Sequence, residues 1–270
     1  MIEQRTLTAH QFGAAAAAYL ASPAHARGTD LGRLAALAHG SQGLAALDLG
    51  CGAGHAAYAL AEGGAQVTAY DLAPEMLAVV EAEATRRGLC NLRTRHGPAE
   101  RLSFPDISFD LVVSRYSAHH WSDVPAALAE VARVLKPGGT LIVIDVVAPE
   151  TPLFDTLLQT VEILRDPSHV RDYRVSEWTA MLRAAGFGSF QADSWTLPAE
   201  FASWVARMHT PALRAEAVRS VWDQAPAEAR AHFQVRSDGS FLMDVAWMQG
   251  RKAPWGGVAG WVGLIASFAP

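Results

Sequence analysis

The sequence predicts an α/β protein built on a doubly wound parallel sheet. From residue 44 onward, short apolar runs alternate with segments of helical periodicity, which is typical of parallel strands joined by crossover helices. A glycine-rich turn joins the first apolar run to the helix after it, and an acidic residue ends the second run. These observations predict the fold class and place a ligand site at the carboxyl ends of the first two strands.

The alternation also gives the expected order of the elements. Pro74 suits the first turn of a helix, because its missing N–H has no helical partner there. Beyond Pro149 the periodicity changes, and two of the later helical stretches contain Trp and Met. Strands are expected at 44–49, 66–70, 91–96, 108–114, 139–147, 188–196 and 241–249, and helices at 53–63, 74–88, 123–135, 152–165, 176–185, 199–208 and 211–224.

Two further helices are expected before the first strand. Residues 11–20 are rich in alanine, the strongest helix former. Asp30 is a plausible N-cap for a second helix that ends at Ala38, because its side chain can accept from the first free N–H groups. By the same reasoning, Ser176 is expected to cap the helix over 176–185, and Gly186 to end it.

The glycine turn is the strongest functional signal in the chain. Gly50, Gly52 and Gly54 come at alternate positions directly after an apolar run. Glycine allows a ligand to approach the backbone and tolerates a positive φ. The second strand ends on Asp71, roughly 20 residues later, where a carboxylate can accept hydrogen bonds from ribose hydroxyls. The pattern indicates a nucleoside cofactor; the alternative is a tight strand-to-helix turn without a ligand.

The composition argues against several classes of protein. The chain has 270 residues, of which 50% are hydrophobic and 18% charged, so it can bury a sizeable core. Its net charge of −5 argues against a nucleic-acid partner. The two cysteines make neither a disulfide framework nor a metal-ligand pattern. The N-terminus lacks the pattern of a secretory signal, so we expect a cytoplasmic protein.

The apolar C-terminal tail, 253–270, carries no charge. Its glycines and prolines argue against a membrane span, and its length barely reaches what a spanning helix needs. We therefore expect no membrane span. The tail is expected to be a surface-packed or disordered extension, or an oligomer contact.

Three motifs occur in an order that one enzyme family shares. They are LDLGCGAG at 47–54, FDLVVSRYSAHHWSDV at 109–124 and LKPGG at 135–139. With these motifs and Asp71, the chain resembles the class I S-adenosylmethionine (SAM) methyltransferases of the methyltransferase type 11 group, which includes the ubiquinone/menaquinone C-methyltransferases. The resemblance runs from about Phe12 to about Lys252.

The resemblance implies a Rossmann-like, seven-stranded sheet with one antiparallel strand, helices on both faces and a small helical cap. It also implies SAM (S-adenosyl-L-methionine) as cofactor and a small-molecule methyl acceptor. Residues 1–40 would form a helical lid over the cofactor, and 41–252 the methyltransferase domain, with the cap inserted at about 197–225. Tyr19 and His25 would lie in the lid; the alternative for Tyr19 is simple packing.

The resemblance also assigns a cofactor site. The glycine turn would hold the methionine and ribose portions, Asp71 the ribose hydroxyls, and residues 97–100 the adenine. Pro98 departs from the aspartate that many relatives carry, so the Ala99 backbone N–H is the expected contact of that loop. The residues expected to contact the cofactor are Tyr19, Asp48, Gly50, Cys51, Gly52, Gly54, Asp71, Leu72, Met76, Ala99, Glu100 and Ser114.

Four candidate catalytic residues follow the strand expected at 108–114, where an open α/β sheet places reacting groups. They are Arg115, Tyr116, His119 and His120. A neutral imidazole with a pKa near 6.5 can take a proton from an acceptor, and we favour His119 as the one that faces the methyl group. Arg115 could orient an anionic substrate. The alternatives are hydrogen-bonded structural histidines and a metal pair, for which no third ligand is evident.

The acceptor itself cannot be identified from the sequence, and C-, O- and N-methylation all remain open. Apolar residues of the expected cap could line a pocket for a non-polar acceptor, or could pack the cap onto the core; they are Phe201, Trp204, Met208 and Trp222. A nicotinamide-dependent oxidoreductase is an alternative activity, but the glycine spacing departs from G-x-G-x-x-G. A SAM-binding domain that has lost catalysis is a third hypothesis.

Overall fold

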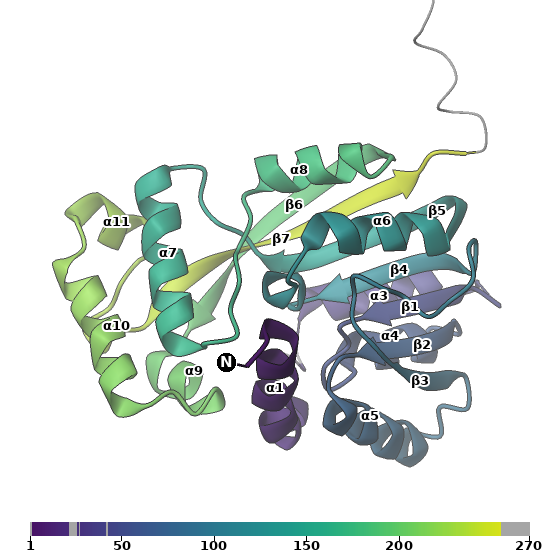
Figure 1. The fold of residues 1–270 in the computed structure, drawn as a ribbon, viewed down its shortest axis with the longest axis horizontal. Helices are drawn as coiled ribbons and strands as arrows, with labels where there is room; N and C mark the ends of the chain where they lie inside the picture. The colour runs from purple at the N-terminus through teal and green to yellow at the C-terminus, as the bar shows by residue number, and fades with distance from the viewer. Residues whose placement is uncertain (1, 22–25, 27, 42, 255–270) are drawn as a thin grey trace, which may run out of the picture.

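A seven-stranded sheet forms the centre of the computed structural model, which describes residues 2–21, 26, 28–41 and 43–254 (Figure 1). The strand order is β3-β2-β1-β4-β5-β7-β6, and β7 runs antiparallel to both of its neighbours. This confirms the predicted Rossmann-like fold class. The strands are β1 (Ala45–Leu49), β2 (Gln66–Asp71), β3 (Leu92–His96), β4 (Phe109–Arg115), β5 (Leu135–Val146), β6 (Phe187–Ala199) and β7 (Phe241–Lys252).

Helices cover both faces of the sheet, as expected for right-handed crossovers between parallel strands. His25 and residues 255–270 lie outside the described residues. The helices are α1 (Gln4–Ala21), α3 (Thr29–Ala38), α4 (His55–Glu62), α5 (Pro74–Arg87), α6 (Val124–Val134), α7 (Pro152–Arg165), α8 (Val175–Ala184), α9 (Phe201–Arg207), α10 (Ala212–Gln224) and α11 (Ala227–His232), with a short 3₁₀ turn, η1 (Ala118–His120).

The central strands are buried on both faces, so their side chains alternate between two hydrophobic layers. In β5, Ile142 and Ile144 join the layer beneath α3 and α4. Leu141 and Val143 join the opposite layer, beneath α6 and α8. This packing holds the central strands firmly, and with them the side chains at their carboxyl ends.

The carboxyl ends of β1, β2 and β4 lie side by side. Leu49 of β1 is level with Tyr70 of β2, and Asp48 is level with Val113 of β4. The glycine turn, Asp71 and the residues after β4 therefore come together at one edge of the sheet, as predicted. Figure 1 shows α1 lying across this edge, and α1 contacts both α5 and α9.

Two predicted helix caps are wrong. Helix α3 begins at Thr29 with Gly28 as its N-cap, while Asp30 lies buried in the first turn and pairs with Arg115. Helix α8 begins at Val175 after Arg174, whose backbone N–H donates to the Glu177 side chain. At α3, the Asp30 carboxylate pairs with the distant guanidinium of Arg115 and so does not cap the helix. At α8, Glu177 supplies the capping acceptor in place of Ser176.

Helices α9, α10 and α11 lie between β6 and β7 in the chain and group with α7 at one end of the molecule (Figure 1). Their aromatic residues pack against β7: the ring centroids of Trp204 and Trp222 lie 5.2 and 4.9 Å from that of Phe241. The sequence had not predicted α11, a helix of six residues.

No helix in the described ranges is both long enough and apolar enough to cross a membrane.

Candidate active site

Backbone hydrogen bonds to β2 fix the position of the glycine turn. The N–H groups of Gly50 and Cys51 both donate to the carbonyl of Tyr70, over 2.8 and 3.0 Å. Gly50 has a φ of +70°, and a Cβ at that position would lie 1.8 Å from the Ser117 hydroxyl oxygen. Gly52 has a φ of +50°, but a Cβ there would meet nothing within 4 Å. The space beside the Gly52 backbone, on the cavity wall, is therefore not filled by any protein atom of the described residues.

Asp71 supports this turn from the end of β2. Its carboxylate accepts from the N–H of Gly52 over 2.8 Å and from that of Ala73 over 2.9 Å. Burial raises its pKa, although the backbone N–H donors oppose that change. Each carboxylate oxygen can accept more than one hydrogen bond, so Asp71 can support the turn and still accept from a ligand.

Asp48 is a buried acid on the wall of the same cavity. It is 1% exposed, and neither carboxylate oxygen makes a hydrogen bond of normal geometry within the described part of the chain. Burial raises its pKa to about 7. A buried carboxylate without a well-formed partner is costly, and a cationic ligand would lower that cost.

These groups line a cavity of about 970 Å³, its open mouth included. Most of the predicted site residues lie on its wall: Tyr19, Asp48, Gly50, Cys51, Gly52, Asp71, Leu72, Met76, Ala99, Glu100, Arg115, Tyr116 and His120. Gly54, Ser114 and His119 do not. Gly54 is the N-cap of α4, and Ser114 is buried within β4.

The contribution of the N-terminal half of α1 was not predicted from the sequence. Arg5, Thr8 and Phe12 line the cavity together with Tyr19. Arg5 and Thr8 were missed because the helix was expected to begin only at residue 11, whereas it begins at Gln4; Phe12 lay within the expected helix but was given no role. The spacing of these three residues places them on one face of a helix, and this spacing could have indicated from the sequence that they act together.

Glu100 and Trp121 make hydrogen bonds that connect segments of the cavity wall. The Glu100 carboxylate accepts from the backbone N–H of Ser122 over 2.9 Å and of Asp123 over 3.3 Å. The indole N–H of Trp121 donates to the Ser117 hydroxyl over 3.1 Å. Three further residues line the cavity without having been predicted from the sequence: Ser117, Trp121 and Ser122.

Arg115 lines the cavity, but its positive charge is already balanced by a carboxylate of the protein. Its guanidinium forms a buried ion pair with Asp30 of α3 and lies 4.6 Å from the centre of the Tyr116 ring. The expectation that Arg115 orients an anionic substrate is therefore not supported by its contacts. Tyr116 has a φ of +52°, a left-handed backbone conformation that is uncommon in a residue other than glycine.

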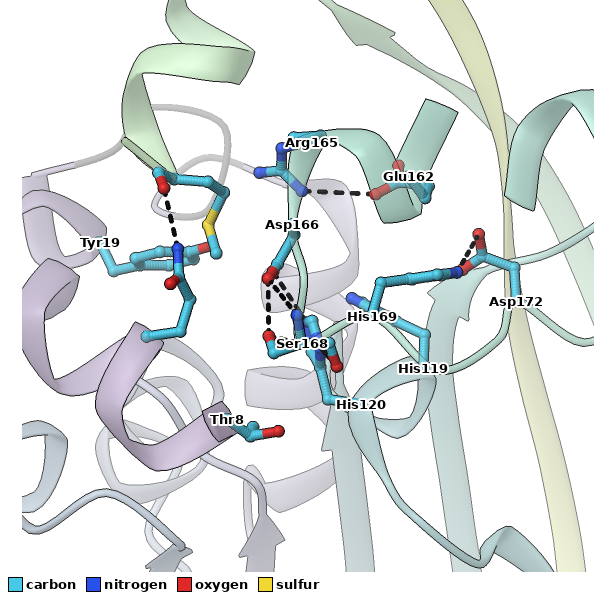
Figure 2. A network of polar contacts seen from close by, with 12 residues as sticks. Thr8, Tyr19, His119, His120, Glu162, Arg165, Asp166, Ser168, His169 and Asp172 are labelled. Atoms are coloured by element: carbon cyan, nitrogen blue, oxygen red, sulfur yellow. Dashed lines mark hydrogen bonds and ion pairs between the residues drawn. The ribbon is translucent and has the colours of Figure 1, made fainter. Parts of the chain in front are cut away.

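The two adjacent histidines have different environments (Figure 2). His119 does not line the cavity; its Nδ1 lies 2.6 Å from a carboxylate oxygen of Asp145 on β5. Burial opposes protonation of this ring, but the charge of Asp145 outweighs it and raises the pKa of His119 to about 9. His119 therefore carries a proton at neutral pH.

His120 is the histidine on the cavity wall, and the expectation that His119 faces the cavity is wrong. Its ring meets the ring of Phe12 edge-on, with centroids 4.7 Å apart, and its Nδ1 lies 3.1 Å from the carbonyl oxygen of Ser168. Burial and the charge of His119 lower the pKa of His120 to about 3. Neither histidine keeps the pKa near 6.5 that was expected.

These two rings belong to a buried polar cluster to which η1 and the segment after α7 contribute (Figure 2). His169 and Asp172 of that segment are 5% and 2% exposed. The N–H groups of Val170 and Arg171 donate to the carbonyl of His119 over 2.8 and 3.2 Å, which docks the segment onto η1.

No group of three or more ligating side chains within the described residues could hold a metal ion.

An acidic, glycine-lined cavity at the carboxyl edge of a doubly wound sheet is typical of nucleoside-binding enzymes of the Rossmann-like class. Comparison with known proteins gives the family. A model of the methyltransferase domain matches residues 47–143. The uncharacterized protein YafE of Escherichia coli is 48% identical over 200 residues, which are 74% of this chain and 97% of YafE.

The uncharacterized methyltransferase YcgJ of Bacillus subtilis is 39% identical over 232 residues, covering 84% of this chain and 92% of YcgJ. Its crystal structure matches with a TM-score of 0.78 over 83% of this chain and 97% of that one. The chain belongs to the family of SAM-dependent methyltransferases. This membership confirms the family resemblance and excludes the oxidoreductase alternative.

Proposed function

We propose that the cavity binds SAM and that the enzyme transfers its methyl group to a small-molecule acceptor. Asp48 is the observation that carries this proposal. It is a buried carboxylate on the cavity wall without a well-formed partner in the described chain, where the cationic methionine portion of SAM would supply one. The empty space beside Gly52 fits the same ligand, because a backbone without a Cβ can lie against it.

The other assignments follow from the order of residues around the cavity. We place the ribose hydroxyls at Asp71, and the adenine between Leu72, Met76 and the loop that holds Ala99. Glu100 stabilises that loop by accepting from the backbone of Ser122. Residues 1–40 would act as the lid, 41–252 as the methyltransferase domain and about 197–225 as the cap.

SAM supplies a methyl group on a positively charged sulfur. The protein then has to align the acceptor, exclude water and remove any proton that the acceptor loses. Tyr116 and His120 follow β4 and lie on the cavity wall. We place the reacting acceptor atom beside them, and Phe12 of α1 would cover it.

The relatives with acceptors in their names do not identify the acceptor here. A demethylmenaquinone methyltransferase of Chlorobaculum parvum is 37% identical over 112 residues, which are 41% of this chain. A malonyl-[acyl-carrier protein] O-methyltransferase of Serratia marcescens is 38% identical over 136 residues, 50% of this chain. These two names specify different acceptors, and each match covers no more than half of the chain.

Calorimetric titration with SAM, with its product S-adenosylhomocysteine (SAH) and with NAD⁺ tests the proposal. We expect the first two to bind and NAD⁺ not to bind. Incubation with methyl-labelled SAM and fractionated metabolites then separates an enzyme from an inactive binding domain. Saturable SAM binding without label transfer to any fraction would favour the inactive domain, and no SAM binding would contradict the proposal.

A further inference from the structure

The contacts of His120 define which of its ring nitrogens can take a proton. Its Nδ1 lies 3.1 Å from the carbonyl oxygen of Ser168 and 3.4 Å from the hydroxyl of the same residue. A carbonyl oxygen only accepts hydrogen bonds, so Nδ1 must carry the ring hydrogen. The lone pair of the neutral ring is therefore on Nε2.

Ser168 is itself fixed from two sides. Its backbone N–H and its hydroxyl both donate to Oδ1 of Asp166, over 2.8 and 2.7 Å. Its carbonyl also accepts from the side chain of Gln4 in α1, over 2.6 Å. The acceptor that orients His120 is thus held in place by Asp166 and by α1.

The second oxygen of Asp166 faces the free nitrogen of His120. Asp166 is fully buried, and its Oδ2 lies 3.9 Å from Nε2. Among the described residues this oxygen has no hydrogen-bond partner. In the neutral state two acceptors therefore face each other, and the arrangement becomes favourable only when Nε2 carries a proton.

We propose that Asp166 is a positioning residue for methyl transfer: through Ser168 it fixes His120 as the Nδ1–H tautomer, and its second oxygen stabilises the ring when Nε2 takes the acceptor's proton. This inference rests on the proposed function. It also names the acceptor class, which is a group that loses a proton on methylation, such as a hydroxyl or an acidic C–H.

The proton balance is simple. As the new bond to the methyl carbon forms, the bond from that carbon to the SAM sulfur would break and leave its electron pair on sulfur. The acceptor's O–H or C–H bond breaks, its proton passes to Nε2, and the pair of electrons from that bond stays on the acceptor. The imidazolium later returns the proton to solvent. Burial and the charge of His119 lower the pKa of His120 to about 3, so the ring is a weak base. Bond formation to the methyl carbon places positive charge on the acceptor, and this charge makes the acceptor's proton strongly acidic, so a weak base can take it.

The chain offers a matched control on the same segment. Asp172 is also buried, its Oδ2 also lacks a partner in the described chain, and that oxygen lies 3.8 Å from Nε2 of His169. His169 does not line the cavity. Removing Asp172 therefore tests the loss of a buried carboxylate beside a histidine that has no place in the reaction.

The test is ¹⁵N NMR of the full-length protein labelled at its ten histidines, with the His120 signals assigned by their loss in His120→Gln. In the wild type with SAH we expect a protonated Nδ1 and an unprotonated Nε2. In Asp166→Ala both signals should shift towards the average of the two tautomers, while Asp172→Ala should leave them unchanged.

Two results would overturn the inference. One is a wild-type His120 with its hydrogen on Nε2, a measurement that does not depend on any variant folding. The other is an unchanged tautomer in Asp166→Ala. Calorimetry with SAM on the same samples reports the proposed function separately, so a protein that binds no SAM but shows the expected tautomer would contradict only the proposed function. Label transfer from SAM to a tertiary amine as readily as to a phenol would contradict the acceptor class.

Discussion

Individual side chains in this site are defined mainly by partners that lie far away in the sequence. His119 and His120 are neighbours, yet Asp145 holds one ring and Ser168 the other. One ring therefore gains a proton at neutral pH and the other remains neutral. The chemical difference between two identical residues comes from which buried groups they meet.

The pair of His119 with Asp145 should make stability depend on pH. The folded-state pKa of His119 is about 9, above the unfolded value of about 6.5, so protonation favours the folded state. This contribution is fully present below pH 6.5 and is lost as the pH rises through 9. We expect the stability difference between wild type and His119→Gln in urea unfolding to be larger at pH 6 than at pH 10.

The control is the same comparison in an Asp145→Asn background. Without the carboxylate there is no ion pair to lose, and only burial acts on the ring, so the stability difference should no longer be larger at pH 6 than at pH 10. A pH-independent difference in the wild-type background would mean that His119 is not protonated in the folded state.

At the scale of elements, α1 connects the two sides of the cavity. It packs on α5 through Ala16 and Met76. On the other side, Gln11 donates to the carbonyl of Met208 over 2.8 Å, and Gln4 donates to that of Ser168 over 2.6 Å. Helix α1 thus covers the cavity while attached to α5 on one side and to the cap and the segment after α7 on the other.

These two glutamine contacts should slow the release of a bound cofactor. Each hydrogen bond contributes about 0.5–1.5 kcal/mol, so Gln4→Ala and Gln11→Ala should each raise the SAH dissociation rate by roughly 2- to 10-fold in stopped-flow displacement. Gln191→Ala, an exposed glutamine on β6, is the control and should leave the rate unchanged. Equal rates in all four proteins would show that α1 does not limit release.

The aromatic residues of α9 and α10 belong to the core rather than to the cavity. Phe201, Trp204, Met208 and Trp222 are at most 4% exposed, and none of them lines the cavity. The expectation that they form an acceptor pocket is wrong, because the rings of Trp204 and Trp222 pack onto Phe241 of β7 and all four side chains are buried away from the cavity. The alternative expectation, that these residues pack the cap onto the core, is the one that the structure supports.

Trp204→Ala should therefore act on stability. Truncating a buried tryptophan costs about 3–5 kcal/mol, and we expect that loss in the free energy of unfolding in urea, with SAH affinity unchanged at low temperature where the variant is folded. Leu213 is 78% exposed, and Leu213→Ala should cost less than about 0.5 kcal/mol. A stable Trp204→Ala protein that had lost only acceptor turnover would restore the pocket assignment.

At the scale of the whole molecule, the sequence predicted what short-range patterns determine. The strand–turn–helix unit, the acidic residue that ends β2 and the alternation of elements each extend over a few tens of residues, and each was predicted correctly. The family resemblance supplied the antiparallel strand β7, which no local pattern shows.

The sequence could not predict contacts between distant segments. The pairing of Asp30 with Arg115 spans 85 residues, and that of His120 with Ser168 spans 48. The first turns of α1 were missed because QRTLTAH lacks an apolar period of its own, and this segment becomes a wall of the site only when it packs across the sheet edge. Three-dimensional packing therefore decides which candidate residues meet.

The central claim, that the glycine turn binds SAM, is tested most directly by calorimetric titration of two matched glycine variants. Gly52 and Gly88 both have positive φ values, and a Cβ at either position meets nothing within 4 Å, but only Gly52 lines the cavity. Gly52→Ala and Gly88→Ala should each lose about 1–2 kcal/mol of stability. We predict that Gly52→Ala loses at least tenfold in SAM affinity while Gly88→Ala binds like wild type; equal affinity in all three proteins would contradict the account.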